Sequence, residues 1–150
     1  IIGDGPERNN LKDIIANLHL ENNIILHGFQ NKDYINDVLS HSKAFIVTSY
    51  TESFGIALLE GMSYGLPGII FDSASGSLEL IKNNFSGYVI KNRSKDVMAK
   101  KIIKLLDNKK EISIMGKNAK ETAKKYSFEK IKERWLNFLE IILKGEEINE

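Results

Sequence analysis

Short apolar runs alternate along this chain with stretches in which apolar residues recur every three or four positions. The runs predict buried strands, and the recurring stretches predict helices. The predicted strands are Ile1-Ile2, Ile24 to His27, Ala44 to Val47, Gly68 to Phe71 and Tyr88 to Ile90. Strands that alternate with helices form parallel sheets with crossover connections, so we expect an α/β fold built on a doubly wound parallel sheet.

The first helical stretches have recognisable starts and ends. Asn31 or Asp33 can cap a helix that runs to Leu39, and a helix from Ile56 should end near Gly65. Further along, Ser77 can cap a short helix over residues 78–82. The helical pattern after residue 94 predicts a helical carboxyl-terminal extension, with residues 146–150 as a frayed end.

The composition is that of an ordinary folded domain. The chain has 150 residues, 42% hydrophobic and 27% charged, which is enough for one sizeable core. It contains no cysteine, which excludes disulfides and thiolate metal sites and makes the cytoplasm the simplest expected location. No apolar run approaches the roughly 20 residues that a membrane-spanning helix needs.

Charge is unevenly distributed, although the net charge is only +1. Residues 1–81 carry 4 Lys and Arg against 10 Asp and Glu, whereas residues 82–134 carry 16 against 6. Because the basic part is helical in pattern, a solvated helix face is the favoured explanation. The alternative is contact with another domain or with anionic lipid, as a peripheral protein at the inner face of the membrane.

The turn after the third predicted strand places two carboxylates, Glu52 and Glu60, around a glycine that opens a helix. A helix amino terminus exposes unpaired amides, so the backbone from Gly55 to Ala57 is a candidate diphosphate site. Glu60, one turn into the helix, can accept hydrogen bonds from a ribose diol, and Glu52 can accept them from sugar hydroxyls. Taken alone, two such acids are more often merely solvated.

Five short segments of the chain look like the successive signatures of a known protein family. They are Gly3-Asp4-Gly5-Pro6-Glu7-Arg8, Ile24 to Phe29, Ser49 to Glu60, Gly65-Leu66-Pro67 and Gly87 to Ile90. In their order and spacing they resemble the family 4 retaining glycosyltransferases, which have the GT-B fold. The resemblance covers nearly the whole chain. It implies that residues 1–150 are the Rossmann-like, carboxyl-terminal half of such an enzyme, a fragment without the amino-terminal acceptor domain and without the first strand and helix of its own domain.

The resemblance also implies roles for individual residues. In this family the first Glu of an E-x7-E motif contacts the donor sugar and the second binds the ribose, which makes Glu52 the candidate catalytic residue and Glu60 the ribose ligand. The other implied substrate-binding positions are Phe54, Gly55, Ile56 and Ala57 at the diphosphate, Gly28, Phe29 and Gln30 beside the base, and Gly3 and Gly5 in the loop at the domain cleft.

The implied enzyme is a hexosyltransferase of polysaccharide biosynthesis. It would move a hexosyl group, with retention, from a nucleoside diphosphate sugar to a glycan or lipid-linked acceptor, with a UDP-sugar as the favoured donor and no metal or other cofactor. The family's diphosphate-binding Arg and Lys lie upstream of Gly3, and its acceptor site lies in the amino-terminal domain. We therefore expect the full-length protein to be active and this chain alone to be inactive.

The match includes departures. Gly61 and Gly68 stand where the family has Ala and a β-branched residue, and we expect both to loosen local packing. Ser75-Gly76-Ser77 replaces a Gly-Gly or Gly-Pro pattern, which leaves the following Glu79 as a weaker candidate near the sugar.

Other chemistries lack their motifs. Gly3-Asp4-Gly5 has no third glycine, so it is a poor dinucleotide fingerprint. His19, His27 and His41 have no metal-ligand spacing, and no serine lies in G-x-S-x-G. The lysines and arginine between residues 91 and 104 have no interleaved aromatic residues, which argues against nucleic acid as a partner.

Two alternatives to a hexosyltransferase donor domain stay open at this point. One is a GT-B relative of different chemistry, such as a nucleotide-sugar epimerase. The other is a non-catalytic domain that keeps the fold and binds a nucleotide or a partner protein. They differ from the favoured interpretation in whether Glu52 and Glu60 meet a nucleotide sugar.

Overall fold

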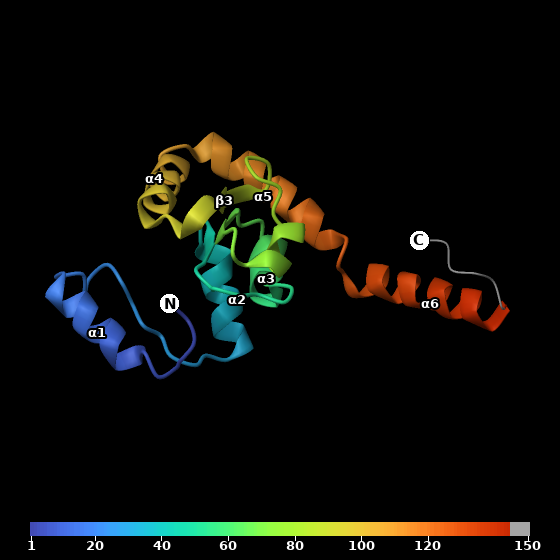
Figure 1. Cartoon of the computed structure of the whole chain (residues 1–150), viewed down its shortest axis with the longest axis horizontal. Coiled ribbons are helices and arrows are strands. Elements are labelled where there is room, and N and C mark those ends of the chain that lie inside the picture. Colours follow the sequence, from blue (N-terminus) through green and yellow to red (C-terminus); the bar gives the residue numbers. More distant parts are fainter. Residues whose placement is uncertain (145–150) are drawn as a thin grey trace. The chain divides into compact units, whose positions relative to one another are not determined.

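The computed structural model describes residues 1–144, and the expected frayed end over residues 146–150 lies outside them. The chain divides into two compact units, Ile1–His41 and the residues from Ser42 onward, and each is described here by itself. Figure 1 labels the α-helices and the strand β3.

The first unit holds α1 (Arg8–Asn17) and α2 (Lys32–His41). The side chain of Asn31 accepts a hydrogen bond from the Tyr34 amide at 2.9 Å, which confirms one of the two expected caps. The predicted strands Ile1-Ile2 and Ile24 to His27 do not form as such. Both segments lie side by side, but they are joined by isolated bridges that end at Gly28.

These two segments are joined by a few backbone hydrogen bonds but do not form a sheet. The Ile1 amino group donates to the Ile25 carbonyl at 2.7 Å, the His27 amide to the Ile1 carbonyl at 2.8 Å and the Gly3 amide to the Gly28 carbonyl at 2.8 Å. The paired stretch is only a few residues long, and Ile25 is 60% exposed, so the pair lacks the second face of packing that a buried strand requires.

The second unit contains a parallel sheet of three strands among the described residues. They are β1 (Phe45–Val47), β2 (Gly68–Phe71) and β3 (Gly87–Ile90), in the order β1-β2-β3. Phe45 pairs with Gly68, and Gly68 in turn pairs with Gly87. The central strand β2 is buried at all four positions, as expected for a strand covered on both faces. The three strands lie within one residue of their predicted bounds.

The helices of the second unit follow the predicted order. They are α3 (Ile56–Ser63), the 3-10 helices η1 (Ser75–Glu79) and η2 (Lys91–Arg93), α4 (Lys95–Leu106), α5 (Lys109–Lys124) and α6 (Phe128–Lys144). One prediction was wrong: Ser77 lies inside η1 and does not cap a helix over residues 78–82. The tight turn begins two residues earlier because the Gly76 amide bonds to the Glu52 carbonyl at 2.9 Å.

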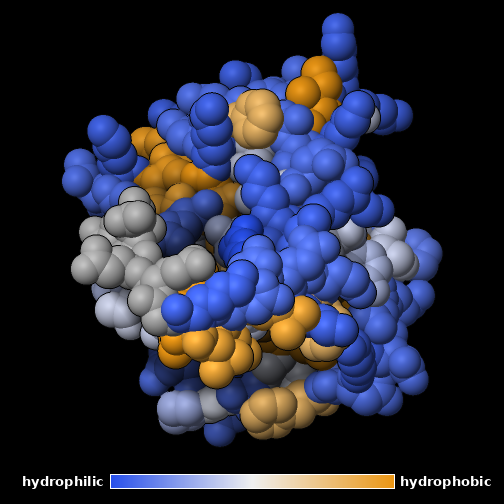
Figure 2. Space-filling view, turned by 90° about the vertical axis from the view of Figure 1, so that its right-hand side faces the viewer, coloured by the Kyte–Doolittle hydropathy of each residue, from blue (hydrophilic) through white to orange (hydrophobic). Residues whose placement is uncertain are grey.

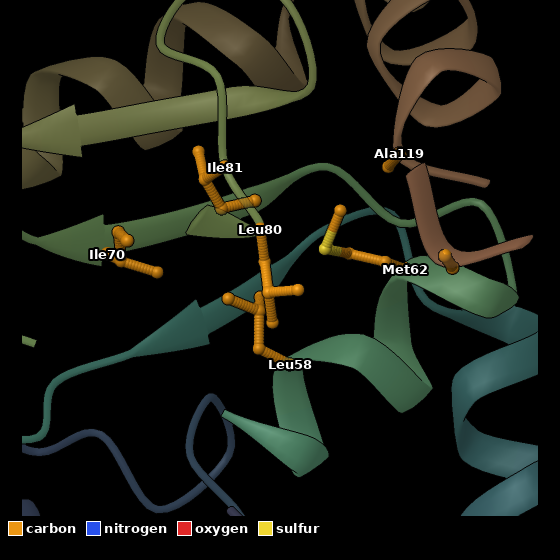
Figure 3. Packing of buried hydrophobic residues seen from close by; sticks show 7 residues of the cluster. Leu58, Met62, Ile70, Leu80, Ile81 and Ala119 are labelled. Carbon is orange, nitrogen blue, oxygen red and sulfur yellow. The ribbon is translucent and has the colours of Figure 1, made fainter. Parts of the chain in front are cut away.

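Helices cover the sheet on both faces. One core cluster contains Leu58 and Met62 of α3, Ile70 of β2, Leu80, Ile81, and Ala119 and Ala123 of α5. Figure 3 shows several of these side chains directed toward one another beside the strands. A second cluster contains Ile69, Phe71, Tyr88 and Ile90 of the sheet with Met98, Leu105 and Met115 of the helices. The alternation along β2 sends Ile70 to one cluster and its neighbours to the other. The expected α/β class with a parallel sheet is confirmed.

The two unusual glycines tighten the packing, contrary to expectation. A Cβ at Gly61 would lie 2.4 Å from the Phe45 ring. At Gly68 it would lie 2.5 Å from Cδ1 of Ile81 and 2.8 Å from Cδ1 of Leu58. At Gly61 the Phe45 ring already fills the space that a methyl group would take, so glycine is required there. At Gly68 the methyl ends of Ile81 and Leu58 occupy that space and would have to move.

The carboxyl-terminal extension is helical, as predicted, and differs from the other helices in its burial. None of the residues of α6, all of which are described, is buried. Trp135 and Leu143 are 60% and 85% exposed. Figure 2, which views the right-hand side of Figure 1, shows hydrophobic side chains between hydrophilic ones on the surface that faces the viewer.

Candidate functional site

The turn between β1 and α3 opens at a glycine with left-handed backbone. Gly55, the residue before the first helical position, has φ 92° and ψ 50° and makes no side-chain cap. The first residue of α3, Ile56, is 68% exposed although it is large and apolar, and Ala57 is also exposed. The first turn of α3 therefore presents amides without a side-chain cap on an open surface, which is a favourable place for an anionic group.

The Glu52 loop and η1 pack directly against each other. A Cβ at Gly76 would lie 2.1 Å from the Ser53 carbonyl oxygen and 2.4 Å from that of Glu52. At Gly55 a Cβ would lie 2.5 Å from the Ser77 Oγ and 3.6 Å from the Cγ of Glu52. Only glycine allows these backbones to approach so closely, so both glycines help to set where the Glu52 side chain lies.

A polar pocket of about 600 Å³ opens beside this contact. Its lining consists of hydroxyl groups, carboxylates and backbone: Thr51, Glu52, Ser53, Ser75, Gly76 and Glu79. Ionised carboxylates only accept hydrogen bonds, whereas hydroxyls both donate and accept them. Such a lining matches a ligand that carries several hydroxyl groups.

A second pocket, of about 340 Å³, lies on the Glu60 side of α3. It is lined by one face of α3 with Ile56, Leu59 and Glu60, and by Lys120, Lys124 and Tyr126 from α5 and the segment that follows it. Residues 56, 59, 60 and 63 share this face because they are three or four positions apart. The two glutamates therefore line different pockets, a polar one before α3 and a more apolar one along it.

The Phe54 side chain is partly buried and packs inward. Its ring lies 5.2 Å from that of Tyr126, edge to face, and packs on the cluster that contains Leu58. Only the backbone of Phe54 is therefore free for a ligand at the turn.

The first unit contains the candidate residues Gly3, Gly5, Gly28, Phe29 and Gln30. Gly3 and Gly28 have φ values of 122° and 69°, which favour glycine. Gly3 and Gly5 line a cavity of about 380 Å³ beside Arg8. A Cβ at Gly28 would lie 3.0 Å from Nη1 of Arg8.

The two residues after Gly28 behave differently from each other. Phe29 is 82% exposed, whereas Gln30 is partly buried and donates from Nε2 to the His27 carbonyl at 2.7 Å. The exposed ring is open to a stacking partner. The Gln30 side chain already forms a hydrogen bond within the turn.

The sequence did not single out every residue that lines the two pockets on α3. Lys120, Lys124 and Tyr126 stand about sixty residues after Glu60, and only tertiary packing of α3 on α5 brings them there. Their spacing along α5 placed Lys120 and Lys124 on one helix face, but nothing local linked that face to α3. Ser53 and Ser75, which were not among the candidate binding residues, also line the polar pocket.

Within residues 1–144 no group of three or more His, Asp or Glu side chains is placed to hold a metal ion. In the same part of the chain, no helix has both the length and the apolar character that crossing a membrane requires.

Comparison with known proteins gives a consistent picture. The family described as glycosyl transferases group 1 matches residues 1–122. The chain is 33% identical over 138 residues to the poly(ribitol-phosphate) alpha-N-acetylglucosaminyltransferase of Staphylococcus aureus, a match that covers 91% of this chain and 28% of the relative. It is 32% identical over 121 residues to the UDP-Gal:alpha-D-GlcNAc-diphosphoundecaprenol alpha-1,3-galactosyltransferase of Escherichia coli, with 80% and 30% covered.

A solved structure agrees in fold. The pneumococcal O-GlcNAc transferase GtfA, crystallised in complex with UDP and GlcNAc, superposes with a TM-score of 0.82 at 29% identity. The match covers 95% of this chain and 29% of that one. The chain thus spans less than a third of the length of each of these proteins.

Proposed function

The chain belongs to the group 1 glycosyl transferases, and we propose on that basis that it is the nucleotide-sugar-binding domain of a retaining hexosyltransferase. One observation carries the proposal: the uncapped first turn of α3 lies between a polar pocket with Glu52 and a more apolar pocket with Glu60. A nucleoside diphosphate sugar has the same order of parts, with a polyhydroxylated ring and a nucleoside on opposite sides of a diphosphate.

The diphosphate would bind at the first turn of α3. Amides that have no partner inside the helix, together with the helix dipole, stabilise negative charge there. This charge grows on the leaving group as the sugar departs, so the same amides would favour the transition state. Gly55 contributes by allowing the phosphates to approach the backbone.

The donor sugar would occupy the polar pocket. Glu52, which is half-buried, would accept hydrogen bonds from sugar hydroxyls close to the reacting carbon, with Thr51 and Ser53 as neighbours. Glu79 faces the same pocket and would read a hydroxyl further from the diphosphate. A carboxylate that accepts from two hydroxyls discriminates between sugars that differ in one hydroxyl, because a lost partner leaves a charged group unpaired.

The nucleoside would lie on the other side of α3. Glu60 would accept hydrogen bonds from the ribose diol, while Ile56 and Tyr126 offer apolar surface. Lys120 adds positive charge to the lining of this pocket, which would favour a diphosphate next to it, whereas Lys124 is paired with Glu121 at 2.7 Å.

The complete reaction requires more protein than these residues. We propose a glycan or lipid-linked acceptor, bound by an amino-terminal domain of the same enzyme, and a uridine diphosphate sugar as donor, without a metal. The proposed location is the cytoplasm, with peripheral contact at the inner face of the membrane. A non-catalytic nucleotide-binding domain and an epimerase relative are the competing functions.

Calorimetry of the full-length protein with uridine, guanosine and adenosine diphosphate sugars tests the proposal. We expect one nucleotide series to bind, and we expect Glu60→Ala to weaken both the nucleotide sugar and the free nucleoside diphosphate by about tenfold or more, since charged hydrogen bonds to the ribose are lost. Glu52→Ala should weaken only the nucleotide sugar, because the free nucleoside diphosphate has no sugar in the polar pocket.

Glu140→Ala is the matched control, because it removes an exposed carboxylate from α6, away from both pockets. Its affinities should equal those of the unchanged chain. If no nucleotide sugar binds, or if Glu52→Ala and Glu60→Ala both bind like the control, the donor-domain proposal is wrong.

A further inference from the structure

Arg93 forms an unusual set of contacts at the carboxyl end of the sheet. Its Nη1 donates to the Ser49 carbonyl at 2.8 Å and to the Ser73 Oγ at 2.7 Å, and its Nη2 donates to the Thr48 carbonyl at 2.9 Å. Residues 48 and 49 follow β1, Ser73 follows β2, and Arg93 itself follows β3. One guanidinium therefore joins the ends of all three strands.

Aromatic rings fix the plane of this guanidinium. Its central carbon lies 3.7 Å from the ring centre of Tyr50 and 4.5 Å from that of Phe71. Phe71 is buried, whereas Tyr50 is 75% exposed. A planar guanidinium both stacks on rings and directs several N–H groups at once, which an ammonium group cannot do.

The backbone under Arg93 is held in an unfavourable conformation. Asn92 and Arg93 have φ values of 53° and 48°, in the left-handed region that residues with a Cβ rarely occupy. The Asn92 amide donates to the Asp72 carboxylate at 3.3 Å, and the Asp72 amide donates to the Ile90 carbonyl at 3.0 Å. Two successive residues of this kind persist only where surrounding contacts fix them, and such sites are often functional.

The segments that Arg93 joins lead directly into the walls of the polar pocket. Thr48 and Ser49 are followed by residues 51–53 in one wall, and Ser73 is followed by residues 75–79 in the other. The two walls meet through the hydrogen bond from the Gly76 amide to the Glu52 carbonyl. Arg93 does not line the pocket, but it holds both segments from which the pocket is built.

We propose that Arg93 is a positioning residue that sets the width of the polar pocket and the place of Glu52, and so controls which sugar the pocket accepts. This inference rests on the proposed function, since it assigns the polar pocket to the donor sugar. It adds a residue that contacts neither the proposed sugar site nor the proposed nucleoside site.

Two substitutions of Arg93 separate its roles. Arg93→Gly removes the guanidinium and also relieves the left-handed backbone, so the chain should stay folded. Arg93→Lys keeps the charge but cannot make the three directed hydrogen bonds. Ser73→Ala removes one of those bonds and leaves the arginine in place, and Arg134→Ala on α6 serves as the control.

Calorimetry compares how each variant changes the affinity for a nucleotide sugar and the affinity for the free nucleoside diphosphate. We expect Arg93→Gly and Arg93→Lys to weaken the nucleotide sugar by about tenfold, as loss of directed charged hydrogen bonds implies, with the free diphosphate unchanged within about twofold. Ser73→Ala should give a smaller loss in the same direction. Equal losses for both ligands would mean general destabilisation and would overturn the proposal, as would full affinity in all three variants.

Amide hydrogen exchange of the chain without ligand provides a second, independent measurement. Release of the two walls should speed exchange of the Gly76 amide by about tenfold in Arg93→Gly, while the Leu105 amide in α4 keeps its rate. If the unchanged full-length protein binds no nucleotide sugar, the proposed function fails, yet this exchange result still decides whether Arg93 holds the pocket. An unchanged Gly76 rate would show that it does not.

Discussion

The two faces of the sheet are built from alternate residues of the same strands, yet the buried hydroxyl groups beside them differ in hydrogen bonding. On the face that packs on α3, the Ser77 hydroxyl is fully buried and has no hydrogen-bond partner among the described residues, and Gly55 beside it has left-handed backbone. On the opposite face the buried Tyr88 hydroxyl donates to Glu111 at 2.5 Å. The first face borders both pockets on α3, and the second borders neither.

This difference agrees with the binding role that we propose for the first face. A buried polar group without a partner raises the free energy of the folded state by about 1–3 kcal/mol. Natural proteins keep such local costs mainly at functional sites. The face that contains Tyr88 supplies stability, and the face that contains Ser77 and Gly55 keeps a particular shape for the pockets.

The largest expected effect comes from adding one methyl group at the contact between the Glu52 loop and η1. Gly76→Ala would place a Cβ 2.1 Å from the Ser53 carbonyl oxygen, so the two segments must move apart. We expect a loss of stability of about 3 kcal/mol from this overpacking, together with loss of nucleotide-sugar affinity. Urea unfolding and calorimetry measure the two effects.

Gly5→Ala is the control for this substitution. A Cβ at Gly5 would meet nothing within 4 Å, so the unfolding midpoint should shift little. Equal unfolding midpoints for the two variants would show that the close contact at Gly76 is not needed, and the polar pocket would lose its structural basis.

A smaller effect is expected on the opposite face, and only at high pH. Burial, followed by the hydrogen bond to Glu111 and the negative charge of that residue, raises the pKa of Tyr88 from 10.0 to about 12. The unfolded chain therefore loses this proton at lower pH than the folded chain does. The resulting stability is fully present below about pH 10 and should fall by about 2 to 3 kcal/mol as the pH rises from 10 to 12.

Chemical unfolding at several pH values, for the unchanged chain and for Tyr88→Phe, isolates this contribution. The difference in unfolding free energy between the two chains should shrink between pH 10 and 12, because the phenylalanine variant has no such proton. At pH 7 the variant should bind nucleotide sugar like the unchanged chain. A weaker affinity of Tyr88→Phe at pH 7 would show that the face with Tyr88 also contributes to binding, and the proposed difference between the two faces would be wrong.

Most of the fold could be predicted because its signals are local. The apolar run at Gly68 to Phe71 and the helix start at Ile56 lie where the pattern indicated, and Ser94 accepts a hydrogen bond from the Val97 amide as a helix cap. The turn with Glu52 and Glu60 was also recognisable, because both carboxylates are close in sequence to the glycine that opens α3. Short-range spacing was sufficient in each case.

The errors arose where distant segments decide the structure. The Ile1-Ile2 pairing was expected to be a strand, but its exposed partner segment provides no second layer. The glycines at positions 61 and 68 were expected to loosen the packing, yet Phe45 and Ile81 fill the space beside them. Arg93 was considered only as part of a solvated basic run, because its three hydrogen bonds reach segments 20 to 45 residues away.

The smallest effect is expected from alanine substitution of two equally buried serines, Ser77 and Ser86. The Ser86 Oγ accepts a hydrogen bond from the Lys82 amide at 3.0 Å, whereas the Ser77 Oγ has no partner among the described residues. Ser77→Ala should therefore raise the unfolding free energy by about 1 kcal/mol, because it removes an unsatisfied buried hydroxyl, and Ser86→Ala should lower it by a similar amount. Opposite shifts of the urea midpoint would confirm that the α3 face keeps a stability cost that the rest of the core avoids. If Ser77→Ala were also destabilising, the hydroxyl would have a partner, and the difference between the two faces would then rest on glycine geometry and on Arg93 alone.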